Sequence, residues 1–398
     1  MAGVLPVLLG GDANVYGMAR SFYEAYGVHS VAVCKKTLPA LAHSRLVQAA
    51  VQNPRLEEDE VFTAALQALA GAYPDKTCLL VSCADGYTMQ LARCRKELAP
   101  LYRFACQPPE VVQSLGTKEG FAAVCAANGL RTPQSVTLAC GAPLPDLPFG
   151  WPVIVKPADS PAYWNCRFPG KRKVYLVQDR TELEQTVATV AQGGYTGALL
   201  LQEYIPGPDT ALGVVNAYCA RDGSVSWMVQ GQVLLQERTP EGVGNYGAIL
   251  TEPARQDTAL LASLAGLLRQ SDWHGFANFD FKYAPNGTPV LFEMNPRQGR
   301  ASYACTAAGA NLALPLVEDL VQQQPVTLPG LHPAVWHTAP WPLVRRRCPD
   351  KNLLRRAEKL RRNGCGCRHL LARGEGPARW MWYWVRQGAY GRKTRQER

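Results

Sequence analysis

The sequence has no long apolar run. No uninterrupted apolar stretch reaches the roughly 18 residues that a membrane-spanning helix needs, which argues against an integral membrane protein. The first residues, MAGVLPVLLGGD, lack the basic start of a signal peptide, and their short apolar stretch runs directly into Gly-Gly-Asp. We therefore interpret this segment as a first β-strand and not as a targeting signal.

Several familiar motifs are also absent. No G-x-x-x-x-G-K-[ST] sequence occurs, which excludes a P-loop enzyme, and Gly10, Gly11 and Gly17 do not fit the G-x-G-x-x-G pattern of dinucleotide-binding proteins. The 13 cysteines are scattered, odd in number and without a Cys-x-x-Cys pair. This usage is typical of a reducing compartment and argues against a disulfide framework, so we expect a cytoplasmic protein.

Positive charge is scarce in most of the chain and concentrated at its end. Residues 341–398 hold 17 Lys and Arg against 4 Asp and Glu, whereas residues 1–340 hold 25 against 28. The net charge of +10 therefore comes from a basic tail attached to a nearly neutral body.

The first part of the chain has the pattern of a parallel α/β domain. A strand is expected at Val4–Leu9, a helix at about Tyr16–Tyr26 and a second strand at Val28–Val33. Residues 77–98 repeat the order strand, turn, helix. Such βαβ units build a parallel sheet, which we assign to residues 1–112.

The middle of the chain mixes helices and antiparallel strands. Thr117 is a candidate N-cap of a helix that ends at Gly129, and WPVIVKP is a short buried strand that ends near Lys156. A polar, aromatic-rich loop over residues 158–173 follows, and later strands surround an Asp222-Gly223 turn. We predict an α+β region over residues 113–327, and a basic, aromatic extension over residues 328–398.

One hairpin carries the strongest chemical signal. In HGFANFDFKYAPNGTPVLFEMNPRQGR, Asn286-Gly287 predicts a two-residue turn. That turn places Asp280 opposite Glu293 with Asn295 on the same face, while Phe279, Phe281 and Phe292 face a core. Opposed acids are unfavourable unless a cation lies between them, and two carboxylates with an amide oxygen suit Mg²⁺. A solvated acidic hairpin face is the alternative, and the flanking prolines leave a longer turn and a shifted register open.

Four features that suit a nucleotide precede this hairpin. Lys118 begins a helix, Lys156 ends a buried strand, and Gly170-Lys171-Arg172-Lys173 closes a flexible loop that could cover phosphates. In QEYIPGPD, Glu203 and Asp209 could reach an adenine amine and a ribose. Each feature alone is more often a solvated charge or a turn residue, so the argument depends on their order along the chain.

With these residues in place, the chain resembles the ATP-grasp carboxylate–amine ligases. FANFDFKY followed by FEMNPRQGR is similar to the metal-binding hairpin of that superfamily. VLLGGDANVYGMARSFYEAYG and FEMNPRQGRASYACTAAGANL are similar to bacterial D-aspartate ligases of peptidoglycan cross-bridge synthesis, and the resemblance spans about residues 4–325. It implies a pre-ATP-grasp domain followed by two lobes, over about residues 113–205 and 206–327, that hold ATP between them.

The resemblance also implies a role for each candidate residue. The implied nucleotide ligands are Lys118, Lys156, Lys173, Glu203, Tyr204, Ile205 and Asp209. Asp280, Glu293 and Asn295 would bind two Mg²⁺ ions, or Mn²⁺ in their place. Arg297 would stabilise the transferring phosphoryl group, and Arg300 would hold a substrate carboxylate or the acyl phosphate. Asn278 stands where some of these ligases carry an arginine, so positive charge at the reaction centre must come from elsewhere.

The implied activity is ATP-dependent amide formation through an acyl phosphate. An amino acid, D-aspartate or a related one, would be joined to an amine of a peptidoglycan precursor. Asp12, Asn14 and Tyr16 follow the first strand, where open α/β sheets bind ligands, and we predict that they contact the substrate. Turn capping by Asp12 and Asn14 is the alternative. A small-molecule peptide ligase outside the cell wall and a non-catalytic nucleotide-binding scaffold at the membrane remain alternative functions.

The basic tail has three interpretations. It could pack on the body as a solvated helix, or it could attract an anionic membrane surface or a lipid-linked precursor on the inner face of the membrane. Arginines beside Trp380, Trp382, Tyr383 and Trp384 suit such an interface. Nucleic acid is the least favoured partner, because no recognised binding module accompanies the charge.

Overall fold

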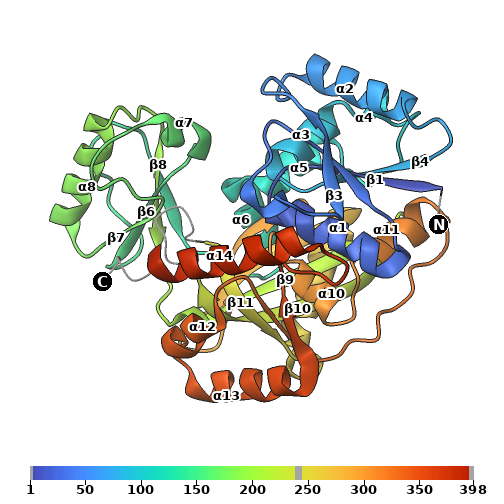
Figure 1. Cartoon of the computed structure of the whole chain (residues 1–398). Coiled ribbons are helices and arrows are strands. Elements are labelled where there is room, and N and C mark those ends of the chain that lie inside the picture. The colour runs from blue at the N-terminus through green and yellow to red at the C-terminus, as the bar shows by residue number, and fades with distance from the viewer. Residues whose placement is uncertain (1–2, 238–243, 394–398) are drawn as a thin grey trace.

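The computed structural model describes residues 3–237 and 244–393, and it contains three β-sheets. Figure 1 shows the sheet with α7 (Ser160–Asn165) and α8 (Arg180–Gln192) as a separate lobe at the left, the N-terminal sheet at the upper right and the seven-stranded sheet below it. The last residues of the predicted basic extension, 394–398, lie outside the described part of the chain.

The N-terminal sheet is parallel, as predicted, and has the strand order β3-β2-β1-β4. Its strands are β1 (Val4–Leu9), β2 (Ser30–Cys34), β3 (Val47–Gln52) and β4 (Thr77–Ser82). The connecting helices are α1 (Ala13–Tyr26), η1 (Pro39–Leu41), α2 (Asp59–Gly71), α3 (Asp85–Arg93) and α4 (Arg95–Leu98). The first strand matches its predicted bounds because it is a buried apolar run that ends at a Gly-Gly turn.

Helix α1 begins three residues earlier than predicted. The carboxylate of Asp12 accepts hydrogen bonds from the backbone N–H groups of Asn14 and Val15, at 3.0 and 3.4 Å, which starts the helix at Ala13. Gly17 lies where α1 approaches the C-terminal part of the chain, and a Cβ added there would lie 2.7 Å from the His369 ring. The glycine therefore permits the close packing of α1 against distant segments.

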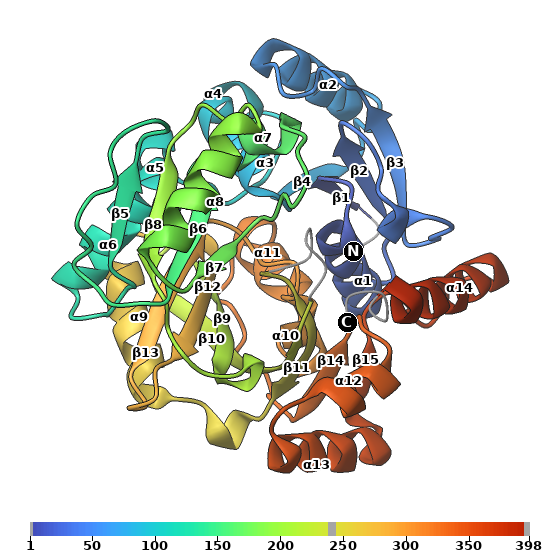
Figure 2. The same cartoon turned by 90° about the vertical axis from the view of Figure 1, so that its left-hand side faces the viewer.

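The second sheet is antiparallel and has the order β5-β8-β6-β7. Its strands are β5 (Ser135–Leu138), β6 (Val153–Pro157), β7 (Tyr175–Val177) and β8 (Leu199–Glu203), with helices α7 (Ser160–Asn165) and α8 (Arg180–Gln192). In Figure 2 these helices cover one face of the sheet. The segment 158–173, predicted as a loop, contains the short helix α7, because the Asp159 carboxylate caps it at the Ala162 N–H.

The third sheet has seven strands, in the order β13-β12-β9-β10-β11-β14-β15. Its strands are β9 (Leu212–Cys219), β10 (Val225–Gln236), β11 (Tyr246–Thr251), β12 (Gly275–Tyr283), β13 (Pro289–Asn295), β14 (Ala334–His337) and β15 (Gly366–Arg368). The helical elements that flank it along the chain are η2 (Asp209–Ala211), η3 (Pro253–Arg255), α9 (Thr258–Gln270), α10 (Tyr303–Ala307), α11 (Ala313–Leu320), α12 (Trp341–Arg347), α13 (Lys351–Leu360), the π-helical turn η4 (Arg361–Cys365) and α14 (Pro377–Lys393).

Two segments pack differently from the predicted domain scheme. Helices α5 (Pro109–Gly116) and α6 (Lys118–Ala127) share a core with Phe279 and Phe281 of the seven-stranded sheet, although the prediction placed residues 113–127 in the first lobe. Strands β14 and β15 lie within the predicted extension and yet complete that sheet. The residue bounds of the three domains remain a prediction.

The C-terminal helix α14 packs against α1 along one side. Arg379 is fully buried, donates to the carbonyls of Leu370 and Ala42 at 3.1 and 2.7 Å, and lies 4.2 Å from the centre of the Tyr16 ring. Tyr383 is buried on the same side of the helix. This side of α14 therefore packs on the body, which was one of the three interpretations of the tail (Figure 1).

Candidate active site

The β12–β13 hairpin brings Asp280 directly opposite Glu293 and Asn278 opposite Asn295, as predicted. The turn itself is longer than predicted. Ala284 and Thr288 close it, with Gly287 at φ +81°, so the loop has one residue more than a two-residue turn. A β-bulge at Phe292 adds one residue to β13 and restores the register before Glu293 is reached.

The bulge reverses two predicted side-chain directions. Leu291, which a regular hairpin would place beside Glu293, is fully buried in the core with Phe279 and Phe281. Phe292, predicted to face the core, instead lines the cleft described below. The extra residue explains both corrections, because a one-residue shift turns each side chain to the opposite face.

Hydrogen bonds orient two of the three predicted metal ligands, Asp280 and Asn295. The Tyr246 hydroxyl donates to Asp280 at 2.7 Å, and the Asn295 amide donates to Asn278 and Asp280 at 3.0 and 3.3 Å. Asn278 donates in turn to Asn216 at 3.1 Å. Asn278 therefore fixes the Asn295 side chain, a role that an arginine at this position would not fill.

Asp280 is harder to ionise than a free aspartate, because it is buried opposite Glu293. Burial, followed by repulsion from Glu293, raises the pKa of Asp280 to about 7. A divalent cation between the two carboxylates would relieve that repulsion, so the donor set fits Mg²⁺. Among the described residues, no group of three or more His, Cys, Asp and Glu side chains could hold a metal ion, and the predicted set has two acids and an amide.

Two lysines lie across from the hairpin. Lys156 donates to Gln202 at 2.7 Å, and burial, then repulsion from Lys118, lowers the pKa of its ammonium group to about 7. Burial also lowers the pKa of Lys118. An anion bound between the two lysines would oppose both pKa shifts and favour the charged forms.

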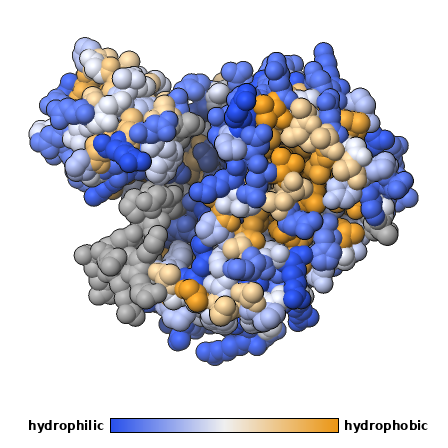
Figure 3. Space-filling model, turned by 45° about the horizontal axis from the view of Figure 1, so that its top comes forward, coloured by the Kyte–Doolittle hydropathy of each residue, from blue (hydrophilic) through white to orange (hydrophobic). Residues whose placement is uncertain are grey.

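A cleft of about 930 Å³ separates the four-stranded antiparallel sheet from the seven-stranded sheet. Figure 3 shows it as a hollow beside the lobe at the upper left. Its lining includes all seven predicted nucleotide ligands and the three predicted metal ligands. The structure thus brings together residues that lie up to 177 positions apart in the sequence, from Lys118 to Asn295.

At the end of the cleft near β8, hydrogen bonds fix Glu203 and the segment that follows the strand. Glu203 is held by Arg131 and by the Gln134 N–H, at 3.1 Å in the latter case. Lys282 donates to the carbonyls of Ile205 and Gly207, at 2.9 and 2.7 Å, and fixes the segment after β8. Lys282 and Phe292 are cleft residues that the sequence argument did not assign to the site.

A second cavity, of about 210 Å³, adjoins the hairpin on the side of α14 and β14. Arg297 and Arg300 line it, together with Trp336 and Thr338. Arg297 donates to Asp85 at 2.9 Å and to Asn295 at 3.1 Å, which ties the N-terminal domain to the hairpin. Trp336 and Thr338 could not be predicted as site residues, because they follow the hairpin by about 40 positions with no motif around them.

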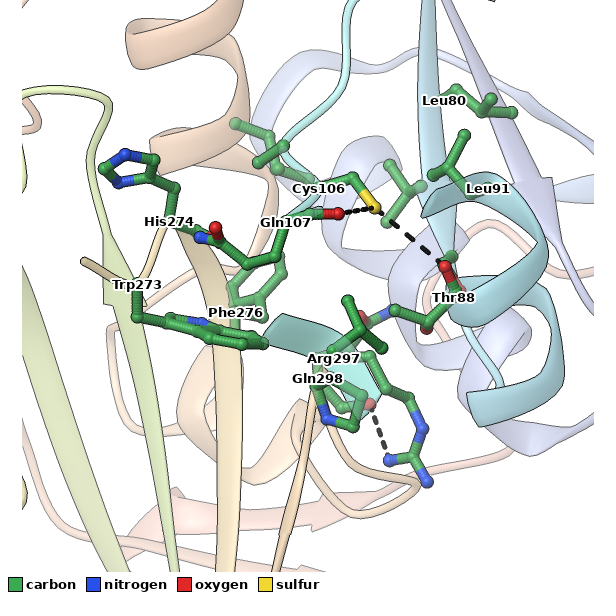
Figure 4. A pocket seen from close by; sticks show the side chains of 16 residues that line it. Leu80, Thr88, Leu91, Cys106, Gln107, Trp273, His274, Phe276, Arg297 and Gln298 are labelled. Carbon is green, nitrogen blue, oxygen red and sulfur yellow. Dashed lines mark hydrogen bonds between the residues drawn. The ribbon is translucent and has the colours of Figure 1, made fainter. Parts of the chain in front are cut away.

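A third cavity lies behind Arg297, between β4, α3 and β12. Figure 4 shows Arg297 and Gln298 below Thr88, with Cys106, Gln107 and Trp273 around the same space. Its volume is about 30 Å³, close to the space that one water molecule takes up in the liquid, about 30 Å³. It is too small for a substrate, so the junction between the domains is nearly closed here.

The predicted substrate residues of the first domain do not line either of the larger cavities. Asp12 caps α1, as the alternative proposed, and Asn14 is buried and donates to the carbonyls of Cys83 and Gln298 at 2.9 and 3.0 Å. Tyr16 is fully buried, and its hydroxyl donates to Glu375 at 3.0 Å. These bonds hold the N-terminal domain to the segment after β13 and to the C-terminal segment, and they leave the side chains of Asn14 and Tyr16 enclosed.

Comparison with known proteins places this geometry in a family. The chain is 35% identical over 330 residues to the D-aspartate ligase of Enterococcus faecium (strain Aus0004), a match that covers 81% of this chain and 77% of that protein. A D-alanine–D-alanine ligase of Anaeromyxobacter (strain Fw109-5) is 25% identical over 176 residues, 43% of this chain and 53% of that protein. No protein-family model matches the sequence.

Solved structures share the fold at low identity. An L-amino acid ligase from Bacillus licheniformis aligns with a TM-score of 0.57 and 16% identity, over 80% of this chain and 74% of that one. The ADP complex of an N5-carboxyaminoimidazole ribonucleotide synthetase aligns with a TM-score of 0.57 and 12% identity, over 84% and 81%. The chain therefore belongs to the ATP-grasp carboxylate–amine ligases, ATP-dependent carbon–nitrogen ligases whose members include the D-aspartate ligase of Enterococcus faecium.

Proposed function

We propose that the protein activates the side-chain carboxylate of D-aspartate with ATP and joins it to an amine of a peptidoglycan precursor. A carboxylate oxygen attacks the γ-phosphorus, the bond to the β–γ bridging oxygen breaks, and ADP leaves. The amine then attacks the acyl carbon, the C–O bond to phosphate breaks, and the amine loses a proton. The products are an amide, ADP and inorganic phosphate.

The observation that carries this proposal is the arrangement of charge across the cleft. Asp280 and Glu293 oppose each other on one wall, and Lys118 and Lys156 lie together on the other. Phosphoryl transfer depends mainly on positioning and on neutralising phosphate oxygens, so acids that hold cations must face lysines that hold phosphates. The shifted pKa values of Asp280 and Lys156 belong to groups that lack their charge partners.

Each remaining residue has a role in this scheme. Lys118, Lys156 and Lys173 bind the phosphates, while Glu203, the backbone of Tyr204 and Ile205, and Asp209 bind adenosine. Asp280, Glu293 and Asn295 would hold two Mg²⁺ ions, which would supply neutralising charge between the phosphates. Arg297 stabilises the transferring phosphoryl group, with Asp85 and Asn295 fixing its guanidinium. Arg300 holds a carboxylate of the acid.

The choice of D-aspartate is supported by the relative at 35% identity over most of both chains. A small-molecule peptide ligase outside the cell wall is the second candidate, because an L-amino acid ligase shares the fold. A non-catalytic scaffold would have no need to keep two opposed acids beside two buried lysines.

Release of ADP and phosphate with a panel of acids and amines separates these functions. We expect release with D-aspartate and a lysine-containing muropeptide, and little with L-aspartate. Release with L-amino acid pairs and none with D-aspartate would favour the peptide ligase. The absence of release with every acid–amine pair would favour the scaffold and contradict the proposal.

We also propose that the protein acts at the cytoplasmic face of the membrane through the outer side of α14. Trp380, Met381, Trp384 and Val385 are 43, 68, 54 and 64% exposed and lie on the side of the helix opposite Arg379 and Tyr383. Residues 376–398 carry six Lys and Arg against one Glu. Exposed tryptophans on a basic helix suit the headgroup region of an anionic bilayer.

Cosedimentation with lipid vesicles tests this surface. We expect binding to vesicles that contain phosphatidylglycerol, weak binding to phosphatidylcholine alone, and a loss of affinity of about ten-fold or more in the Trp380→Ala/Trp384→Ala double variant. Trp151→Ala is the matched control, because Trp151 is 43% exposed on a different lobe. Equal binding by both variants would contradict the proposal. Within the described residues no helix has the length and apolarity to cross a bilayer.

A further inference from the structure

Trp336 of strand β14 and Thr338, which directly follows the end of that strand, line one wall of the 210 Å³ cavity beside the hairpin. Trp336 is 1% exposed, and its ring meets the His369 ring at a centroid distance of 5.3 Å. The ring is therefore fixed by packing before any ligand arrives.

Polar atoms of this cavity lack protein partners. Across the described residues, the buried side-chain atoms without a hydrogen-bond partner include Arg297 Nε, Trp336 Nε1 and Thr338 Oγ1. All three belong to residues that line this cavity, and all three can donate a hydrogen bond. Because buried polar atoms are almost always paired, three donors around one cavity indicate a ligand that presents several acceptor oxygens.

Arg300 is the cation of this cavity that we assign to an anion. The lining holds three acids, Asp85, Asp280 and Glu293, and three cations, Lys173, Arg297 and Arg300. Asp85 is paired with Arg297, and Asp280 and Glu293 form the proposed metal site. Arg300 lies 4.0 Å from Glu237, and its side chain is 44% exposed. A carboxylate would give Arg300 a close partner and would accept hydrogen bonds from Trp336 and Thr338.

The C-terminal helix holds this wall in place. Gln387 of α14 donates to the carbonyl of Thr338 at 2.9 Å. Thr338 and Ala339 donate in turn to the carbonyl of Gly247 on β11, at 2.9 and 3.0 Å. The backbone that presents Thr338 is thus fixed on both sides, as a binding wall requires.

We propose that Trp336 Nε1 and Thr338 Oγ1 donate hydrogen bonds to the second carboxylate of the acid substrate, the one that is not phosphorylated, while Arg300 neutralises it. The inference rests on the proposed function and deepens it, because it makes the site selective for a dicarboxylic amino acid. The reacting carboxylate lies toward Asp280 and Glu293, and the other points toward β14. An acid without an acceptor group at the second position leaves both donors unpaired.

Binding measurements with two acids test this subsite. Calorimetric titration of the full chain with D-aspartate, and with 3-aminopropanoate, which lacks the α-carboxylate, is carried out with Mg²⁺ and a non-hydrolysable ATP analogue. We expect Trp336→Phe and Thr338→Val each to weaken D-aspartate binding about ten-fold or more, the loss typical of a hydrogen bond to a charged group. Neither substitution should change the affinity for 3-aminopropanoate or for the nucleotide.

The controls separate the subsite from the fold and from the proposed function. Trp341→Phe, on α12 and outside the lining of this cavity, should bind D-aspartate as the wild type does. Thr338→Val keeps the shape of its side chain, so it tests the subsite even if Trp336→Phe lowers stability. If the variants lost the same affinity for both acids, or lost affinity for neither, this inference would be overturned while the proposed function would stand. A wild type that neither binds D-aspartate nor releases ADP with it would overturn the proposed substrate as well.

Discussion

Asp280 and Glu293 are two of the proposed metal ligands, and their mutual repulsion also destabilises the fold. Two carboxylates paired across neighbouring strands repel each other, and burial adds to the repulsion by raising the pKa of Asp280 to about 7. The sequence alone was sufficient to predict this pair, because hairpin turn chemistry and side-chain alternation are local rules. The hydrogen-bond partners of the hairpin come from other strands: Tyr246 donates to Asp280, and Asn216 accepts from Asn278. No local rule predicts which strands lie beside each other in the sheet.

Replacing Glu293 with Gln should separate activity from stability. We expect kcat to fall at least about 100-fold, because a cation ligand worth several kcal/mol is lost. The free energy of unfolding without Mg²⁺ should stay equal or rise, since the repulsion with Asp280 disappears. ADP release and urea unfolding measure the two effects, and Asp222→Asn, at an exposed turn, is the control. Retained activity would refute the metal assignment.

The pH dependence should be a narrow bell. Asp280 must lose its proton to hold a cation, so kcat/KM for MgATP should rise as pH increases toward 7. Lys156 must keep its proton to bind phosphate, so kcat/KM should fall as pH increases beyond 7. This profile reports the free enzyme. In Lys156→Arg the guanidinium stays charged, so the alkaline limb should disappear even if activity is lower. A profile that is flat from pH 6 to 8 would contradict both roles.

At the scale of elements, two irregularities compensate each other in the β12–β13 hairpin. The loop is one residue longer than the sequence predicts, and the bulge at Phe292 adds the residue that restores the register. The turn sequence and the alternation of polar residues were sufficient to predict that Asp280 pairs with Glu293. The bulge follows from the packing of Leu291 into the core, which depends on Phe279 and Phe281 and on helices α6 and α9.

Helix α14 is the element that the sequence described least well. Its composition predicted a basic, aromatic extension, and the structure shows an inner side that is part of the body. The inward residues include Arg379, a buried cation that no hydrophobic pattern would select. Its carbonyl partners, Leu370 and Ala42, come from distant segments, so only the folded chain reveals the pairing.

Arg379→Met should loosen α14 from the body. The carbonyls of Leu370 and Ala42 would lose their donors, and unpaired buried acceptors cost about 1–3 kcal/mol each. We therefore expect the free energy of unfolding to fall by about 2 kcal/mol or more in urea titration. Arg386→Met, at an exposed position of the same helix, should change it by less than about 0.5 kcal/mol. Equal effects of the two substitutions would show that α14 is held by other contacts.

At the scale of the whole molecule, the catalytic groups come from three sheets. Lys156 of the antiparallel four-stranded sheet and Lys118 of α6 lie in one cleft with acids of the seven-stranded sheet, and Asp85 of the first domain fixes Arg297 beside them. The order of these elements along the chain, together with the family resemblance, was sufficient to predict the architecture. Trp336 and Thr338 lie beyond the resembling segment, so the wall that selects the acid could be found only in the folded molecule.

Transfer of oxygen from the acid to phosphate tests the central claim most directly. D-aspartate labelled with ¹⁸O in its side-chain carboxylate is incubated with ATP, Mg²⁺ and the amine acceptor, and the released phosphate is analysed by mass spectrometry. If the carboxylate is phosphorylated before the amine attacks, each phosphate carries one ¹⁸O atom from the acid. Amide formation with phosphate that contains no ¹⁸O would contradict the account.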